Sequence, residues 1–436
     1  MELWKHQENV LKDQRNYLLL AHGCGLGKTL TLTELVKSRA FSVLVLCPKA
    51  LVAKWEKEME RSLPNTPYKI LSPYWFKKYH KELEYYDAVL IDEADAPYFG
   101  TNQTSKALFA YLKRTNPSYV FMGTATPYRS TPMNIYNAGK ICQYMPMSWP
   151  DFRQKFFFQE YFGSQPVWTP KMKHKDPAVK AETQRELNEY LRNFADIVRM
   201  EDCFDVPKQL YPEEYIAMTP AQEKLLKKLD EYTENRSVFF RYANEIENGW
   251  LDEKALGEHT EVESIKEEWI LDASEKHDTM VVFSMYRNQQ RRLYELLKKK
   301  HKKAYVAMIN GDNSSDAPEI SAIVDSIAEG THPKYTQAYL VASTGVSSGW
   351  ECKYVSFAPF ASLPWSYQQW EQSIGRVLRS DNLKENIYSI LLSKNKNCVS
   401  IDERIWENLK DGNDFDPVKY AEQERASGSI NSSRLN

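Results

Sequence analysis

Residues 18–29 of the sequence, LLLAHGCGLGKT, have the composition and spacing of a phosphate-binding loop. Glycines leave backbone N–H groups free to surround an anion, while a Lys and a following hydroxyl can reach outer phosphate oxygens and a bound Mg²⁺. The residues that supply these groups are Gly23, Gly25, Gly27, Lys28 and Thr29. His22 stands where the strict motif has glycine, so a glycine-rich turn without a ligand is the alternative for this stretch alone.

The residues on either side of the loop favour phosphate binding. Tyr17–Ala21 is an apolar run typical of a buried strand, and Thr29–Ser38 predicts a helix. The amino terminus of that helix would face the anion, where its backbone dipole is favourable. A strand, a glycine loop and a helix in this order are what a nucleotide site requires.

An acidic tetrad follows the apolar run AVLI. Carboxylates at the carboxyl end of a buried strand lie at the rim where α/β sheets bind ligands. In Asp92-Glu93-Ala94-Asp95 we expect Asp92 to share the Mg²⁺ with Thr29, and Glu93 to orient the water that attacks the γ-phosphate. A solvated acidic turn is the alternative for the tetrad.

Two further motifs bear on coupling and on phosphoryl transfer. Thr124 and Thr126, in Gly-Thr-Ala-Thr-Pro, end another apolar run and are predicted to sense the γ-phosphate. Arg376 and Arg379, in QSIGRVLR, project from the same side of a predicted helix. Their guanidinium groups can neutralise the charge that develops during transfer. A surface helix that carries two arginines is the alternative for this motif.

Composition limits the classes of protein to consider. With 436 residues, 42% of them apolar and 27% charged, the chain is typical of a globular protein of more than one domain. The apolar runs are shorter than a membrane span and the amino terminus lacks a signal-peptide core, so we expect a cytoplasmic protein. The six cysteines form no C-x-x-C pair, which argues against a disulfide framework or a zinc site. A net charge of −2 means that any nucleic-acid surface must be local.

Short apolar strands alternate with helical segments in two regions, which predicts two α/β lobes with parallel sheets. The first region contains Tyr17–Ala21, Ser42–Cys47, Asp87–Ile91 and Tyr119–Gly123, and the second contains Met280–Ser284, Tyr305–Ile309, Ala338–Ala342, Val355–Ala358 and Ile387–Leu392. We predict an ATP-binding lobe over residues 1–150, helical insertions and a linker over 151–275, and a second lobe with a returning terminal helix over 276–425. The second lobe is entered near residue 206, and residues 426–436 form a disordered tail.

In their order along the chain, the glycine-Lys-Thr loop, DEAD, Thr-Ala-Thr and Q-x-x-G-R-x-x-R resemble the motor of superfamily 2 helicases and translocases. Finer similarity points to the Swi/Snf-type DNA translocases, and it covers most of residues 1–415. The segments that carry it are His6-Gln7, VLCPKALVAKWEKEM at Val45–Met59, Leu187–Gln209, VFSMYRNQQRRL, STGVSSGWE, YQQWEQSIGRVLR and ILLSKNKNCVSIDERI.

The resemblance implies two RecA-like motor lobes, ATP and Mg²⁺ as cofactors, and DNA as the partner. It also implies further roles for individual residues. Gln7 would read adenine, and Gln372 would couple the nucleotide site to movement. The implied nucleic-acid contacts are Lys49, Lys54, Ser284 and Thr344.

The sequence therefore predicts an ATP-dependent motor that hydrolyses ATP on binding DNA and translocates along, or remodels, duplex or branched DNA in preference to RNA. A DEAD-box-like RNA helicase is one alternative, because it shares the tetrad and Thr-Ala-Thr. A non-translocating, nucleotide-gated DNA clamp would use the same folds. A small-molecule kinase could have the glycine loop, but it would leave the second lobe and Arg376 unexplained.

Overall fold

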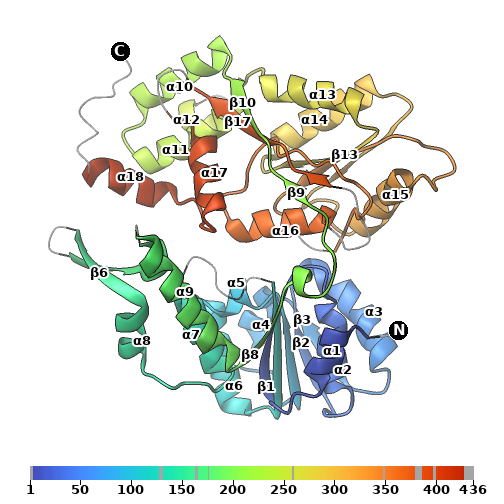
Figure 1. The fold of residues 1–436 in the computed structure, drawn as a ribbon, viewed down its shortest axis with the longest axis vertical. Helices are drawn as coiled ribbons and strands as arrows, with labels where there is room; N and C mark the ends of the chain where they lie inside the picture. Colours follow the sequence, from blue (N-terminus) through green and yellow to red (C-terminus); the bar gives the residue numbers. More distant parts are fainter. Residues whose placement is uncertain are drawn as a thin grey trace. The chain divides into compact units, whose positions relative to one another are not determined.

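The structure is a computed structural model. It describes residues 3–125, 127, 131–162, 165–174, 176–257, 260–346, 349–378, 385–395 and 399–426. The chain divides into two compact units, Met1–Asp205 (unit 1) and Val206–Asn436 (unit 2), which Figure 1 draws in blue to green and in green to red. The division falls inside the segment 151–275 that the sequence set apart, so residues 151–205 belong to unit 1.

Unit 1 is built on a parallel sheet in the order β3-β2-β4-β5-β1-β8. All neighbouring strands in it run the same way, so their carboxyl ends meet at one edge. The strands are β1 Tyr17–His22, β2 Val43–Leu46, β3 Tyr68–Leu71, β4 Ala88–Asp92, β5 Tyr119–Thr124 and β8 Ala195–Val198. The strands expected around β1, β2, β4 and β5 are thereby confirmed.

Alternate residues of each strand enter two different cores, because successive side chains point to opposite faces of a sheet. Leu18 and Leu20 pack with α1, α2 and α3, whereas Leu19 and Ala21 pack with the helices of the other face. The helices of unit 1 are α1 Lys5–Leu11, α2 Lys28–Lys37, α3 Val52–Ser62, α4 Pro73–Tyr79, α5 Asp95–Tyr98, α6 Gln103–Thr115, α7 Met133–Ile141, α8 Trp149–Phe156 and α9 Pro177–Arg192, with short 3₁₀ turns η1 Lys49–Leu51, η2 Lys171–Lys173 and η3 Met200–Asp202.

Three features of unit 1 were not predicted from the sequence. β3, at the edge of the sheet, is only partly buried, so it lacks a continuous apolar run. β8 is short and contains Asp196, yet it pairs with β1 and completes the other side of the sheet. An antiparallel hairpin of β6 Phe157–Phe162 and β7 Gln165–Pro170 lies where helical insertions were expected.

Unit 2 also contains a parallel sheet, with β15 between β13 and β14. The predicted strand Val355–Ala358 is wrong as a regular strand, because it forms only an isolated bridge at Phe357 and a few backbone hydrogen bonds to β13 and β16. Two further bridges, at Phe360, join β13 to β17, which pairs in parallel with β10. The strands are β9 Gln209–Leu210, β10 Glu213–Ala217, β11 Trp250–Leu251, β12 Thr260–Glu261, β13 Thr279–Ser284, β14 Tyr305–Ile309, β15 Ala338–Ser343, β16 Asn386–Ile387 and β17 Ile390–Lys394.

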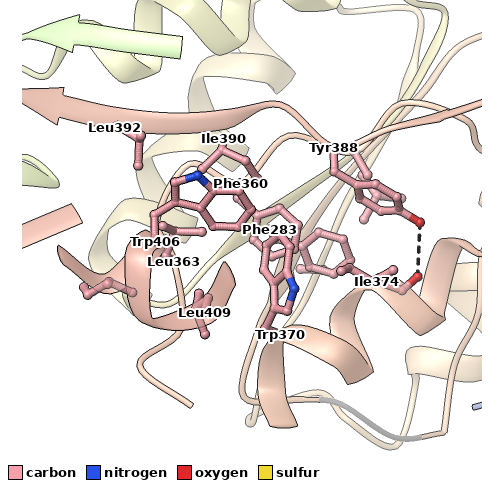
Figure 2. Close-up of a cluster of buried hydrophobic side chains, with 14 of the residues drawn as sticks. Phe283, Phe360, Leu363, Trp370, Ile374, Tyr388, Ile390, Leu392, Trp406 and Leu409 are labelled. Carbon is pink, nitrogen blue, oxygen red and sulfur yellow. Dashed lines mark hydrogen bonds between the residues drawn. The ribbon is translucent and has the colours of Figure 1, made fainter. Parts of the chain in front are cut away.

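One face of this sheet is covered by a cluster of large apolar side chains, which Figure 2 shows at close range. Phe283 of β13 stacks on Phe360 at a ring-centroid distance of 4.8 Å, and Phe360 contacts Trp370 at 4.5 Å. The Tyr388 hydroxyl donates a hydrogen bond of 3.3 Å to the carbonyl oxygen of Ile374. The cluster therefore holds α16, which carries the predicted arginines, against the sheet.

The other elements of unit 2 complete its layers. They are α10 Pro220–Tyr232, α11 Arg236–Glu247, α12 Glu253–Leu256, α13 Ile265–Lys276, α14 Arg287–Lys300, α15 Ala317–Glu329, α16 Tyr367–Val377, α17 Ile401–Lys410 and α18 Pro417–Ala426. In the part of the chain that the structure describes, no helix is both long and apolar enough to cross a membrane. The predicted class, α/β with two parallel-sheet lobes, is confirmed.

A fully buried ion pair joins distant segments of unit 2. Lys266 of α13 donates to Asp402 of α17 at 2.5 Å, and both side chains are about 1% exposed. The other Asp402 oxygen accepts from the Asn244 amide at 2.8 Å. Glu247 of α11 accepts the backbone N–H groups of Ile401 and Asp402 at 2.8 and 2.9 Å, and its burial raises its pKa to about 8. The network thus ties α11, α13 and α17 together.

Replacing Lys266 with Met should destabilise the protein by about 3–5 kcal/mol, because it leaves Asp402 as an unpaired buried charge. The free energy of unfolding in urea measures the effect. Lys276→Met, at the exposed end of the same helix, is the matched control and should change stability by less than about 0.5 kcal/mol. Equal stabilities for the two variants would show that the buried pair has no such role.

Candidate active site

The phosphate-loop candidate connects β1 to α2 by a tight turn. Gly25 and Gly27 have φ angles of 79° and 68°, in the left-handed region that glycine adopts without strain. A Cβ atom on Gly27 would lie 2.7 Å from Nε2 of Gln7. The Lys28 ammonium donates to the carbonyl oxygens of His22 and Gly23 at 3.0 and 3.2 Å. Its charge is therefore held over the loop itself, where a phosphate would be bound.

Helix α1 supports the loop from behind. The Gln7 side-chain amide donates to the Gly27 carbonyl at 3.3 Å and to the Thr31 hydroxyl at 3.1 Å. Its own oxygen accepts the Trp4 backbone N–H at 2.9 Å, and the side chain is 2% exposed. Gln7 thus lies beside the loop, as a residue of the nucleotide site must, and its predicted contact with adenine stays a prediction.

The departure from the strict motif at His22 has a structural reason. The His22 ring is fully buried, and its Nε2 lies 2.7 Å from an oxygen of Asp196 on β8. The Gly23 backbone N–H also donates to the Val198 carbonyl of β8 at 2.9 Å. Burial lowers the pKa of His22, which favours the neutral imidazole. His22 therefore anchors the start of the loop to the strand next to β1.

The acidic tetrad lies beside this loop because β5 pairs with both β1 and β4. Asp92, at the end of β4, is the register partner of Gly123 on β5. A Cβ atom on Gly123 would lie 3.6 Å from Cδ of Lys28 and 3.7 Å from Oδ1 of Asp92. The Lys28 stem and the Asp92 carboxylate therefore both lie close to the Gly123 backbone.

Glu93 has a backbone conformation that few residues other than glycine adopt, with φ at 50°. The turn is held by the backbone N–H of Ala94, which donates to the Gly123 carbonyl at 3.0 Å. The Glu93 N–H itself donates to Oδ1 of Asp92 at 3.1 Å. Such conformations gather at functional sites, where surrounding contacts impose them. Glu93 is therefore a candidate for a positioned catalytic carboxylate.

These residues fit ATP with Mg²⁺. Mg²⁺ is usually bound by one or two carboxylates together with substrate phosphates. Asp92 is 4% exposed at the strand end, and Thr29 is the second residue of α2, directly after Lys28. The loop, its lysine, a hydroxyl and a carboxylate are thus present on the strand ends where this chemistry requires them.

Trp55 is a part of the site that sequence reasoning missed. Its indole N–H donates to Oδ2 of Asp92 at 2.9 Å, and its ring is completely buried among residues of α2, α3 and the sheet. In the sequence, Trp55 lies within Val45–Met59, the segment that also contains the implied nucleic-acid contacts Lys49 and Lys54. Only the packing of α3 against the sheet shows that this tryptophan holds the predicted metal ligand.

The predicted residues of unit 2 lie on and near α16. The Arg376 guanidinium donates to the Trp350 carbonyl at 2.9 Å, and its Nε donates to the Gln372 carbonyl at 3.3 Å. The Gln372 side chain is 6% exposed.

Thr124 is the buried last residue of β5 in unit 1. Thr126 and Arg379 lie outside the described residues.

The predicted nucleic-acid contacts differ in exposure. Lys49, at the start of η1, and Lys54, on α3, are exposed. Ser284 is fully buried, and its hydroxyl donates to Oε1 of Gln289 at 2.7 Å. Thr344 is 1% exposed. The two lysines are thus surface residues of unit 1, whereas the two hydroxyl residues lie inside unit 2.

Comparison with known proteins bears directly on unit 2. Residues 260–381 match the family described as helicase conserved C-terminal domain. This part of unit 2 is therefore similar to a helicase C-terminal domain. The match includes β13 to β15 and α16, with Arg376, and it confirms the resemblance to superfamily 2 helicases and translocases. The match supports a helicase-like ATP-dependent motor.

The other comparisons are more distant. The SWI2/SNF2 ATPase core domain of Sulfolobus solfataricus is a solved structure that is similar over 90% of this chain and 86% of its own. The sequence identity is 15% and the TM-score is 0.39. No curated protein matches the sequence.

Trp55→Phe should keep the buried ring but remove the hydrogen bond to Asp92. Because a hydrogen bond to a charged group contributes about 1.5–3 kcal/mol, ATP turnover should fall on the order of tenfold or more. The Mg²⁺ concentration for half-maximal turnover should rise, since Asp92 is no longer held. A Mg²⁺ titration of ATP hydrolysis measures both effects, with Trp149→Phe in α8 as the control. An unchanged Mg²⁺ dependence would contradict this role of Trp55.

Proposed function

We propose that the protein is a DNA-dependent ATPase of the Swi/Snf-type branch that translocates along, or remodels, duplex or branched DNA. The observation that carries the proposal is that Lys28 and Asp92 both lie close to Gly123, in a chain whose residues 260–381 match a helicase C-terminal domain. The proposed ATP-binding residues are Gln7, Gly23, Gly25, Gly27, Lys28 and Thr29, with Asp92 and Thr29 as the Mg²⁺ ligands. We place this activity in the cytoplasm.

The residues of unit 1 have separate proposed roles in ATP hydrolysis. Bound ATP·Mg²⁺ supplies the phosphoanhydride and a metal that offsets its negative charge. Lys28 holds the outer phosphate oxygens, and the backbone N–H groups of the loop surround the others. Glu93 orients the attacking water and accepts its proton. The unusual backbone at Glu93, imposed by Gly123 and Asp92, supports this separate role.

We further propose that Arg376 and Arg379 neutralise the charge that develops on the transferred phosphoryl group. On contact with a phosphate, the Arg376 guanidinium would exchange its bond to the Trp350 carbonyl for bonds to phosphate oxygens. This exchange of partners would link hydrolysis to a change in the 350–352 segment, because the Cys352 N–H donates to the Arg376 carbonyl. Thr124, Thr126 and Gln372 are the proposed coupling residues.

Duplex DNA is the proposed track because Val45–Met59 and Leu187–Gln209 resemble the duplex-DNA branch. Lys49 and Lys54 are the proposed phosphate contacts, and their exposure supports this role. Contacts to phosphates give low sequence specificity and strong salt dependence. The burial of Ser284 and Thr344 supports direct side-chain contacts less well. The proposed DNA contacts therefore lie chiefly in unit 1.

ATP turnover measured without polymer and with single-stranded, duplex or forked DNA or RNA tests this proposal. We expect DNA that contains duplex to stimulate turnover more than RNA does. A clear preference for RNA would instead support a DEAD-box-like RNA helicase. Stimulated turnover without movement, measured by displacement of a bound third strand, would support a nucleotide-gated clamp.

Two substitutions test the division of labour at the nucleotide. Lys28→Ala should abolish turnover and weaken ATP binding, because the phosphates lose their charged partner. Glu93→Gln should bind ATP·Mg²⁺ normally but hydrolyse it about 10²–10⁴-fold more slowly, since only proton transfer is lost. Nucleotide affinity and turnover are measured on the same preparations. A Glu93→Gln protein that binds ATP as poorly as Lys28→Ala would refute the separate roles.

Arg376→Ala should lower DNA-stimulated turnover on the order of a thousandfold while ATP affinity stays close to that of the wild type. Arg291→Ala, an exposed arginine on α14, is the matched control. Thermal unfolding of both variants checks that loss of the Trp350 contact has not unfolded unit 2. Unchanged turnover in a folded Arg376→Ala protein would leave the residue with a structural role only.

A further inference from the structure

An unexplained surface lies at the carboxyl ends of β2 and β3 in unit 1. The two strands pair in parallel, and the Cys47 N–H after β2 donates to the Leu71 carbonyl of β3 at 3.1 Å. The segments that follow them therefore emerge side by side. They border a hollow of about 380 Å³ that is lined by Lys49, Ser72, Pro73, Tyr74 and Trp75. We call these residues, with Lys77, Lys78 and Tyr79 of α4, the aromatic-lysine surface.

Helix α4, PYWFKKY, presents aromatic rings to solvent on this surface. The side chains of Tyr74 and Trp75 are 62% and 43% exposed. Trp75 and Tyr79 stack with an interplanar angle of 10° and a centroid distance of 5.6 Å. Phe76, by contrast, is fully buried and contacts Tyr98 and Tyr111. The buried Phe76 fixes the helix, so the exposed rings are held on a rigid element rather than on a free loop.

The same surface is positively charged. The Lys78 ammonium lies 5.1 Å from the ring centroids of both Trp75 and Tyr79, and the Lys77 ammonium lies 5.9 Å from that of Tyr74. Residues 69–81 contain four lysines and no acidic residue. In the described part of the chain, no carboxylate forms an ion pair with Lys49, Lys77 or Lys78. The positive charge of this surface contrasts with the charge of the whole chain, which is −2.

We propose that the aromatic-lysine surface binds unpaired nucleotides of a nucleic-acid strand. Tyr74 and Trp75 stack on exposed bases, while Lys49, Lys77 and Lys78 contact the flanking phosphates. Exposed aromatic rings beside cationic side chains are the usual means of holding a single strand without reading its sequence. The proposal rests on the proposed function and narrows its substrate to DNA that has an unpaired segment, such as a fork or a gap.

Two properties favour a nucleic acid over a protein as the occupant. Lysine is depleted in protein interfaces, whereas it is the common contact to phosphate. The surface also follows the carboxyl ends of β2 and β3. The nucleotide-site candidates lie at the carboxyl ends of β1, β4 and β5, and all five strands are parallel, so both sets of residues lie at the same end of the sheet. Bases inside a duplex have no free faces on which a ring can stack. This surface would therefore bind DNA that has unpaired bases more tightly than fully paired DNA.

Binding of the full chain to two labelled DNAs of equal length, one fully paired and one with a single-stranded arm, tests the proposal. Trp75→Ala should weaken binding to the armed DNA about tenfold and leave binding to paired DNA unchanged. Trp75→Phe should retain most of the affinity, because a phenyl ring still stacks. Phe41→Ala is the matched control. Phe41 is 88% exposed, but it lies before the amino-terminal end of β2, whereas the aromatic-lysine surface follows the carboxyl ends of β2 and β3.

The dependence of DNA affinity on salt concentration distinguishes the contribution of ring stacking from that of the lysine charges. Lys78→Ala should lower the slope of log K against log salt concentration by about one, whereas Trp75→Ala should not change it. A 5-iodouracil base in the arm should photocrosslink to the peptide that contains Tyr74 and Trp75.

Equal affinity of wild-type protein and Trp75→Ala for the armed DNA would overturn this inference, and would leave a protein partner as the occupant of the surface. Equal losses on both DNAs would overturn it as well, because they would show contact with the duplex. These results would not affect the proposed function as long as DNA stimulates ATP turnover of the wild type. Failure of the wild type to bind either DNA, with no stimulation of turnover, would refute the proposed function itself.

Discussion

The pairing of β5 with both β1 and β4 is the constraint on which the nucleotide-site candidates depend. It brings the glycine loop that follows β1 and Asp92, the last residue of β4, to the same end of the sheet, although they are far apart in sequence. The Lys28 stem and the Asp92 carboxylate then both lie close to the Gly123 backbone. Any larger residue at Gly123 would press on Leu32, whose Cδ1 would lie 3.3 Å from the added Cβ.

The supports around this centre come from elements that carry no phosphate-binding motif. Gln7 of α1 and Asp196 of β8 hold the two ends of the glycine loop, and Trp55 of α3 holds Asp92. Each of these hydrogen bonds has at least one buried partner, Gln7, His22 or Trp55, whose polar group would be costly to leave unpaired. The loop and the carboxylate are thus oriented by the packing of both faces of the sheet.

Unit 2 is stabilised in a different way. Its aromatic cluster fixes α16 against the sheet, and the buried Lys266–Asp402 pair joins α13 to α17. Asn244 and Glu247 complete the hydrogen bonds of that network, so α11 is fixed as well. A rigid support of this kind suits the proposed exchange of partners by Arg376, because the change would then be confined to the side chain and the segment at Trp350.

The sequence by itself determined the class of fold and the chemistry-bearing motifs, because these depend on local patterns. Apolar runs marked the buried strands β1, β2, β4 and β5, and the glycine-Lys-Thr loop and the acidic tetrad each needed only a few adjacent residues. The edge strand β3, the short strand β8 and the bridged segment at 357–360 could not be predicted in this way, since their pairing depends on distant neighbours rather than on their own composition. Tertiary structure alone decided that Trp55 bonds to Asp92, that His22 turns to Asp196, and that Ser284 is buried. It also decided that Tyr74 and Trp75 are exposed while Phe76 is buried, because the face of a short helix is chosen by what packs against it.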